Sequence, residues 1–223
     1  MIKNVTIYGE RCSGTNYLEI LLKTNFRIEI TKKYGSKHFF GFHNEKLKNS
    51  KETLFICITR DLVEWLNSLY RKPHHLGVHL RKNIYSFLNE EFYSYNDNES
   101  GSKDGKEIME DRNIYTKERY KNIFEMRHTK LKFMIEDLPT LVDNYIFIRY
   151  EDLINDFEGT MLRLKNKGLN VKENIEFPIN NNNYKGRENE KFIKKENNLI
   201  SLQRILNNPN LIRTYEIKLG YLN

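Results

Sequence analysis

The chain has 223 residues, enough for one domain with a sizeable core, and its 39% hydrophobic and 30% charged residues are typical of a soluble globular protein. No apolar run approaches the roughly 20 residues that a membrane-spanning helix needs, so no membrane association is expected. The net charge of +7 favours anionic partners such as nucleotides, sulfated or phosphorylated ligands and nucleic acid, and a lysine-rich solvated surface is the alternative explanation.

The cysteine content and the N-terminus indicate a reducing compartment. Cys12 and Cys57 are too few for a disulfide framework. Met1–Asn4 lead directly into the first predicted strand, which predicts a cytoplasmic protein without a signal peptide or anchor, and a catalytic domain cut from an anchored protein would look the same. We expect a single domain over residues 1–223, with a flexible loop near 94–113 that is rich in Asn, Ser, Gly and Asp.

Segments with strand character alternate with segments of helical spacing. Strands are expected at Val5–Tyr8, His38–His43, Thr53–Thr59 and Tyr145–Arg149. Helices are expected at Leu18–Leu22, Leu62–Arg71, Leu76–Phe92, Thr116–Val142, Phe157–Lys167 and Asn198–Leu206. This alternation predicts a three-layer α/β/α fold with a central parallel sheet.

A glycine-bearing loop joins the first predicted strand to the first helix. Gly9 and Gly14 have the spacing of a Walker A loop, G-x-x-x-x-G, in which backbone N–H groups surround a phosphate at the helix N-terminus. The lysine that completes a Walker A loop is missing, because Thr15 and Asn16 come next. The sequence therefore predicts a phosphate-binding loop that lacks the lysine of a nucleoside triphosphatase, and this leaves open which phosphate binds there.

Polar residues follow each predicted strand. Ligands of parallel sheets bind at the carboxyl ends of the strands. We therefore expect the residues after the strand ends to meet in one cleft; these are Arg11 with Ser13, His43, Arg60 and Arg149.

A second pair of residues suits a terminal phosphate. Arg60 stands at a strand end, and Ser68 lies about two turns into the next helix. A guanidinium fork and a hydroxyl can satisfy several phosphate oxygens. A helix-capping arginine and a serine packed against the sheet are the structural alternative.

Joined in this order, Arg11-Cys12-Ser13-Gly14-Thr15 and the spacing from Arg60 to Ser68 resemble the sulfotransferases that use 3′-phosphoadenylyl sulfate (PAPS). That family pairs a loop of the form R/K-S-G-T for the 5′-phosphosulfate with a later R-x-x-x-x-x-x-x-S for the 3′-phosphate. The stretch Phe147–Leu153 is similar to the family's strand that ends in Y-E-D-L. The resemblance implies a fold like that of P-loop nucleoside triphosphate hydrolases, PAPS as co-substrate, 3′,5′-ADP as product, and no metal.

The resemblance also implies which residues bind the nucleotide. Lys185-Gly186-Arg187 resembles the family's R-K-G segment, with Tyr184 in place of the first Arg, and an Asn-rich flexible loop is the alternative. Arg11 departs from the pattern, because Cys12 stands where the family has a basic residue. The expected nucleotide-binding residues are Arg11, Cys12, Ser13, Gly14, Thr15, Asn16, Arg60, Ser68, Lys185, Gly186 and Arg187.

Histidines are the candidates for the general base that accepts the proton of the acceptor hydroxyl. The family commonly has a His, sometimes a Glu, after the second strand, and this residue accepts the proton of the acceptor hydroxyl. His43 stands at that place and is the expected base, with His38 as the alternative, while Arg11 would offset charge on the leaving phosphate. His74 and His75 would line the acceptor mouth or belong to a turn next to Pro73, and the turn is favoured.

The sequence thus predicts a PAPS-dependent sulfotransferase that modifies an acceptor hydroxyl, with a carbohydrate among the candidate acceptors. An atypical P-loop kinase is one alternative, and the missing lysine argues against it. A non-catalytic protein that binds a nucleotide or a nucleic acid is the other. No nucleic acid, membrane or metal partner is expected for the favoured function.

Overall fold

The computed structural model describes residues 2–96, 105–176 and 199–223, which divide into two compact units. The first unit consists of Met1–Lys37, His43–Arg60 and Leu138–Asn197. The second unit consists of His38–Phe42, Asp61–Asp137 and Asn198–Asn223.

The first unit is built on a four-stranded sheet in the order β2-β1-β3-β4, with all pairs parallel. Its strands are β1 (Asn4–Gly9), β2 (Glu29–Ile30), β3 (Thr53–Thr59) and β4 (Tyr145–Arg149). All seven residues of β3 are buried, as expected for an apolar, β-branched run that packs on both faces. The predicted α/β class and parallel sheet are therefore confirmed.

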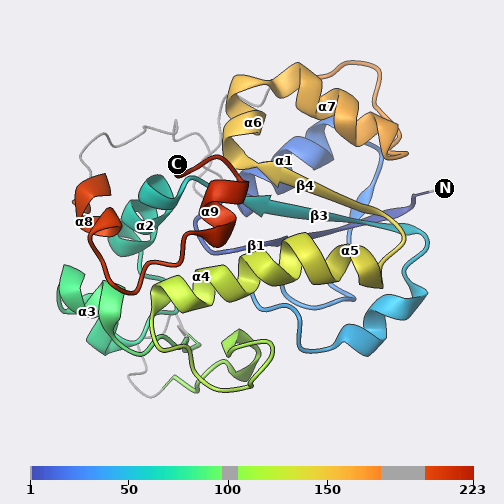
Figure 1. The fold of residues 1–223 in the computed structure, drawn as a ribbon. Helices are drawn as coiled ribbons and strands as arrows, with labels where there is room; N and C mark the ends of the chain where they lie inside the picture. Colours follow the sequence, from blue (N-terminus) through green and yellow to red (C-terminus); the bar gives the residue numbers. More distant parts are fainter. Residues whose placement is uncertain (1, 97–104, 177–198) are drawn as a thin grey trace. The chain divides into compact units, whose positions relative to one another are not determined.

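Helices α1 (Thr15–Asn25), α6 (Tyr150–Asn155) and α7 (Phe157–Asn166) lie together beside the sheet (Figure 1). Their apolar faces share one core with the strands, which includes Leu18, Leu22, Ile56 and Leu164. Gly168, with φ of 90°, follows α7 as predicted. The first unit also contains α5 (Leu138–Leu141) and a 3-10 helix at Asn44–Asn49.

The second unit is helical in the residues that the structure describes. Its helices are α2 (Leu62–Arg71), α3 (Ile84–Asn89), α4 (Ile123–Lys132), α8 (Leu202–Leu206) and α9 (Thr214–Lys218). Buried Arg127 on α4 donates to Glu216 on α9 at 2.6 and 3.0 Å, and its guanidinium lies 4.6 Å from the ring of Trp65 on α2. This ion pair therefore joins three helices.

The predicted strand over His38–His43 is wrong. These residues form bends, with no strand hydrogen bonding, and most of them belong to the helical unit. Gly41 has φ of 87°, and a Cβ there would lie 2.9 Å from Cδ1 of Ile114. The aromatic residues contribute to side-chain packing instead, as in the pair of Phe40 stacked on helical Phe133, so their presence here does not indicate a strand.

Several helices are shorter than predicted. The segment 76–92 contains a 3-10 turn at Val78–Arg81 and then α3. The segment 116–142 becomes helical only after Asn122, whose side chain accepts hydrogen bonds from two first-turn N–H groups, and it continues as a π-helix at Phe133–Asp137. Short strand β2, α6 and α9 were not predicted. Across the described residues, no helix combines the length and apolarity of a membrane span.

The described residues of the predicted loop over 94–113 are packed against the rest of their unit. Ser94 and Asp111 are buried, and Tyr95 forms a β-bridge with Glu107. Residues 97–104 lie outside the described part of the chain.

Candidate functional site

The carboxyl ends of β1, β3 and β4 meet, as the parallel sheet requires. Gly9 pairs with Ile58 in the strand register, and Thr59 pairs with Arg149. The loop that follows β1 and the start of α1 therefore lie at the same edge of the sheet as Arg60. The nucleotide is predicted to bind at this end of the sheet.

The loop Glu10–Gly14 is closed by its own hydrogen bonds. The N–H and the hydroxyl of Ser13 donate to the carbonyl of Glu10, at 3.2 and 2.7 Å. Ser13 is fully buried, and Arg11 is only 7% exposed. The hydroxyl of Ser13 therefore closes the loop in this structure, and it would have to rotate to donate to a ligand.

The loop ends in a left-handed residue at the N-terminus of α1. Gly14 has φ of 93° and occupies the N-cap position, where it has no side chain to cap the first turn. By contrast, α2 begins at Asp61, whose carboxylate accepts the N–H of Glu64 at 2.9 Å. The amides of Thr15 and Asn16 therefore face the position at which an anion binds to a helix N-terminus.

Tyr150 connects the loop to Arg60. Its ring lies where a Cβ on residue 14 would be, with Cδ2 only 2.3 Å from that position. The guanidinium of Arg60 lies 4.8 Å from the ring centroid, and Tyr17 contacts the ring at 6.3 Å between centroids. Tyr150 had no predicted role, although it is the Tyr of the Y-E-D-L segment directly after β4.

Lys37 supplies a cation beside α1. The N–H of Gly9 donates to the carbonyl of Lys37 at 2.9 Å, so this residue lies next to the end of β1. Its ammonium donates to the side chain of Asn16 and lies 3.4 Å from Oε2 of Glu19. Burial lowers the pKa of Lys37, and the charge of Glu19 opposes part of that effect.

Lys37 was missed because it lies just before the predicted strand His38–His43, where no element and no site residue were expected. The strand before it, β2, has only two residues. β2 pairs only with Asn4 and Val5 at the start of β1, so its end does not mark this position, and the hydrogen bond between Gly9 and Lys37 is what brings Lys37 to the carboxyl end of β1.

Two charged residues at this edge are paired within the protein. Buried Glu10 accepts a hydrogen bond from the hydroxyl of Thr59 at 3.2 Å. Arg149 donates to Asp152 through Nε and Nη2, at 3.1 and 2.7 Å. The ion pair of Arg149 with Asp152 therefore connects the end of β4 to the start of α6.

His43 lies outside any strand and precedes the 3-10 helix Asn44–Asn49. Its side chain is 50% exposed, and Nδ1 is 3.7 Å from Oε1 of Glu45. The positional reason for choosing His43 as the base depended on a strand that does not form.

The remaining predicted residues that the structure describes belong to the second unit. Ser68 lies on α2, and His74 and His75 form the predicted turn after that helix. Nδ1 of His75 donates to the carbonyl of Tyr95 at 2.8 Å, and Phe39 contacts the His75 ring at 5.9 Å between centroids. His38 precedes Phe39, so the structure brings His38 and His75 into one aromatic cluster.

Lys185, Gly186 and Arg187 lie outside the described residues. Among the residues that are described, no three His, Cys, Asp or Glu side chains are gathered as metal ligands.

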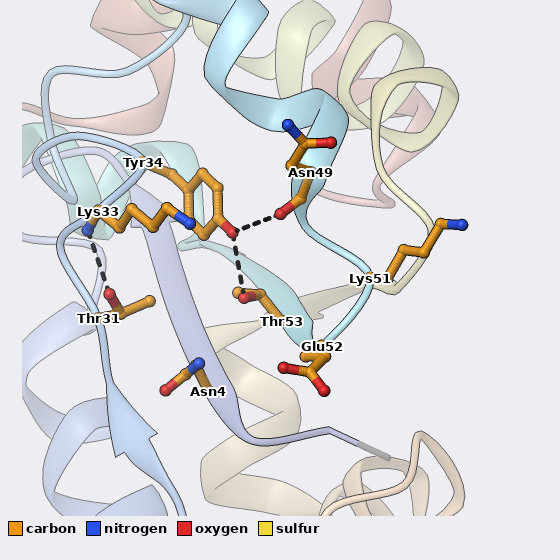
Figure 2. Close-up of a pocket in the computed structure, with 8 residues that line it drawn as sticks. All are labelled: Asn4, Thr31, Lys33, Tyr34, Asn49, Lys51, Glu52 and Thr53. Carbon is orange, nitrogen blue, oxygen red and sulfur yellow. Dashed lines mark hydrogen bonds between the residues drawn. The ribbon is translucent and has the colours of Figure 1, made fainter.

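A hollow of about 380 Å³ lies at the opposite end of the sheet from the loop (Figure 2). Asn4 and Thr53, the first residues of β1 and β3, line it together with Tyr34. The hydroxyl of Tyr34 donates to the carbonyl of Asn49 at 3.2 Å. Because ligands of parallel sheets bind at the carboxyl ends of strands, this hollow is not the predicted site.

Comparison with protein-family models, with curated proteins and with solved structures finds no match for this chain.

Proposed function

We propose that this protein is a sulfotransferase with a P-loop-type, three-layer fold, and that it transfers a sulfuryl group from PAPS to an acceptor hydroxyl. The observation that carries the proposal is the uncapped N-terminus of α1 behind a glycine loop, with Lys37 beside Asn16. This arrangement favours an anion at the helix end. The order of the Arg11–Thr15 and Arg60–Ser68 segments resembles that of the sulfotransferases, and this resemblance supports PAPS as the source of the anion.

In the proposed reaction, the acceptor oxygen attacks sulfur and its proton passes to a histidine, His43 or His38. The bond between sulfur and the 5′-phosphate oxygen breaks, and its electron pair leaves with 3′,5′-ADP. The amides of Thr15 and Asn16, together with Lys37 and Arg11, would offset the charge that develops on that phosphate. Arg60, Ser68 and the Lys185–Arg187 segment would hold the 3′-phosphate.

Ligand-induced stabilisation tests the nucleotide. At 100 times its Kd, 3′,5′-ADP should stabilise the protein by about 2.7 kcal/mol, and for a chain of this size we expect a melting shift of roughly 5–10 °C. Arg60→Ala should remove most of the shift. Arg163→Ala is the matched control, because Arg163 donates to the carbonyl of Phe147 from the exposed side of α7. No shift in the wild type at millimolar 3′,5′-ADP would contradict the proposal.

The two alternative functions, a kinase and a nucleic-acid-binding protein, predict different ligands. A kinase would be stabilised by ATP with Mg²⁺, and a nucleic-acid-binding protein would bind oligonucleotides with a steep salt dependence. Radiolabelled PAPS, offered with a panel of sugars, phenols, peptide tyrosines and small alcohols, then tests for transfer and identifies the acceptor class.

A further inference from the structure

A buried ion pair holds the main chain at His38. The ammonium of Lys130 on α4 donates to the carbonyl of His38 at 2.8 Å and to the carboxylate of Asp111. The other oxygen of that carboxylate accepts the hydroxyl of Ser94. Lys130 is 3% exposed and Asp111 is 1% exposed. The network therefore joins α4, two loops and the main chain at His38 inside the second unit.

The residues after His38 are packed around the same ammonium. Lys130 Nζ lies 5.9 Å from the ring of Phe39 and 5.5 Å from the ring of Phe40. Phe40 stacks on Phe133, and Gly41 is fitted against Ile114. The His38–Phe42 segment has no strand hydrogen bonds. Its conformation is instead stabilised by these contacts and by the Lys130 ammonium.

A lysine in this position is costly unless its charge is compensated. Asp111 compensates the charge, and the His38 carbonyl takes one of the remaining ammonium donors. A network of this kind, with each member satisfied, makes a segment rigid. His43, by comparison, has a half-exposed side chain and a single long contact to exposed Glu45.

We propose that Lys130, together with Asp111, is a positioning residue that holds His38 for accepting the proton of the acceptor hydroxyl, an inference that rests on the proposed sulfotransferase function. As the acceptor oxygen bonds to sulfur, its proton moves to the His38 imidazole, and the electron pair of the broken sulfur–oxygen bond leaves with the 5′-phosphate. Lys130 acts on this step as a positioning residue, through its hydrogen bond to the main chain of His38.

The test compares two double variants of the full chain. Lys130→Met/Asp111→Asn removes both charges of the network together, so that no buried charge is left unpaired. Arg127→Met/Glu216→Gln is the matched control, because it removes an equally buried ion pair of the same unit, which joins α4 to α9.

The first readout is the His38 imidazole signal in a ¹H–¹³C NMR spectrum, assigned with His38→Gln. We expect this signal to shift or broaden in Lys130→Met/Asp111→Asn and to stay unchanged in the control, while the His43 signal is unchanged in both. A His38 signal that is the same in wild type and in Lys130→Met/Asp111→Asn overturns the positioning role. This outcome does not depend on any acceptor.

The second readout is transfer from radiolabelled PAPS to an acceptor found in the screen. Lys130→Met/Asp111→Asn should lower kcat by about 10- to 100-fold, with KM for PAPS within about twofold of the wild type, because misplacing a reacting group affects the chemical step. Equal losses of kcat in both double variants overturn the positioning role. If the wild type is not stabilised by 3′,5′-ADP, the proposed function has failed, and the NMR comparison still decides whether Lys130 holds His38.

Discussion

The ring of Tyr150 occupies the space that a side chain on residue 14 would need. A Cβ at Gly14 would lie 2.3 Å from Cδ2 and 2.9 Å from Cε2 of this ring. The same ring supports the guanidinium of Arg60 at 4.8 Å. The glycine of the loop and the arginine after β3 are therefore linked through one aromatic side chain at the start of α6.

Gly14→Ala should destabilise the protein by roughly 2–4 kcal/mol, because alanine is strained at φ of 93° and its methyl group meets the Tyr150 ring. Urea unfolding measures this cost. In a Tyr150→Ala background the clash is gone and only the backbone strain remains, so the cost of Gly14→Ala should fall. An equal cost in both backgrounds would contradict the contact.

Lys37→Met should weaken binding of 3′,5′-ADP about 10- to 100-fold, because the proposed charge-assisted contact to the phosphate would be lost. Without ligand, the melting temperature should stay unchanged or rise, because burial of this ammonium is unfavourable, as its lowered pKa indicates. Isothermal titration calorimetry measures the affinity. Lys23→Met is the control, because Lys23 contacts the same Glu19 at 2.7 Å from an exposed position. Equal losses in the two variants would argue against a role for Lys37 in binding.

Asn67→Ala should lower the free energy of unfolding by about 2–3 kcal/mol. The side-chain amide of Asn67 donates to the carbonyl of Ile200 at 2.8 Å and accepts its N–H at 2.9 Å, and all these groups are buried. Gln203→Ala removes an exposed hydrogen bond to Asn207 and should cost less than about 0.5 kcal/mol. Chemical denaturation compares the two, and similar small effects would mean that Ile200 is not held by Asn67.

Glu107 should contribute stability that is lost in acid. Hydrogen bonds from Arg119 and Arg112 lower the pKa of Glu107 from 4.5 to about 2. Because the carboxyl is more acidic in the folded state, its contribution is present above about pH 4.5 and is lost as the pH falls towards 2. Glu107→Gln should therefore cost roughly 1–2 kcal/mol at pH 7 and very little at pH 2. Unfolding measured across this range checks the sign, and a cost that does not change with pH would contradict it.

The strands β1, β3 and β4 and the helices α1, α2 and α7 could be predicted because each carries a local signal. The apolar, β-branched runs Thr53–Thr59 and Tyr145–Arg149 agree with β3 and β4 residue for residue. The Gly9–Gly14 loop between a strand and a helix was predicted for the same reason, since glycine, strand and helix signals lie within one short stretch. These features depend on neighbours in the chain, and so they can be read from the sequence.

The sequence by itself determined the parallel α/β class, the loop before α1 and the candidate residues around it. Only the tertiary structure decided that Lys37 lies beside that loop, that Tyr150 joins Gly14 to Arg60, and that His38–Phe42 is a packed loop held by Lys130. These relations join residues that are distant in sequence, through side-chain packing and buried charge compensation. No periodicity in the chain encodes such contacts, because they depend on which faces and strand ends the fold brings together.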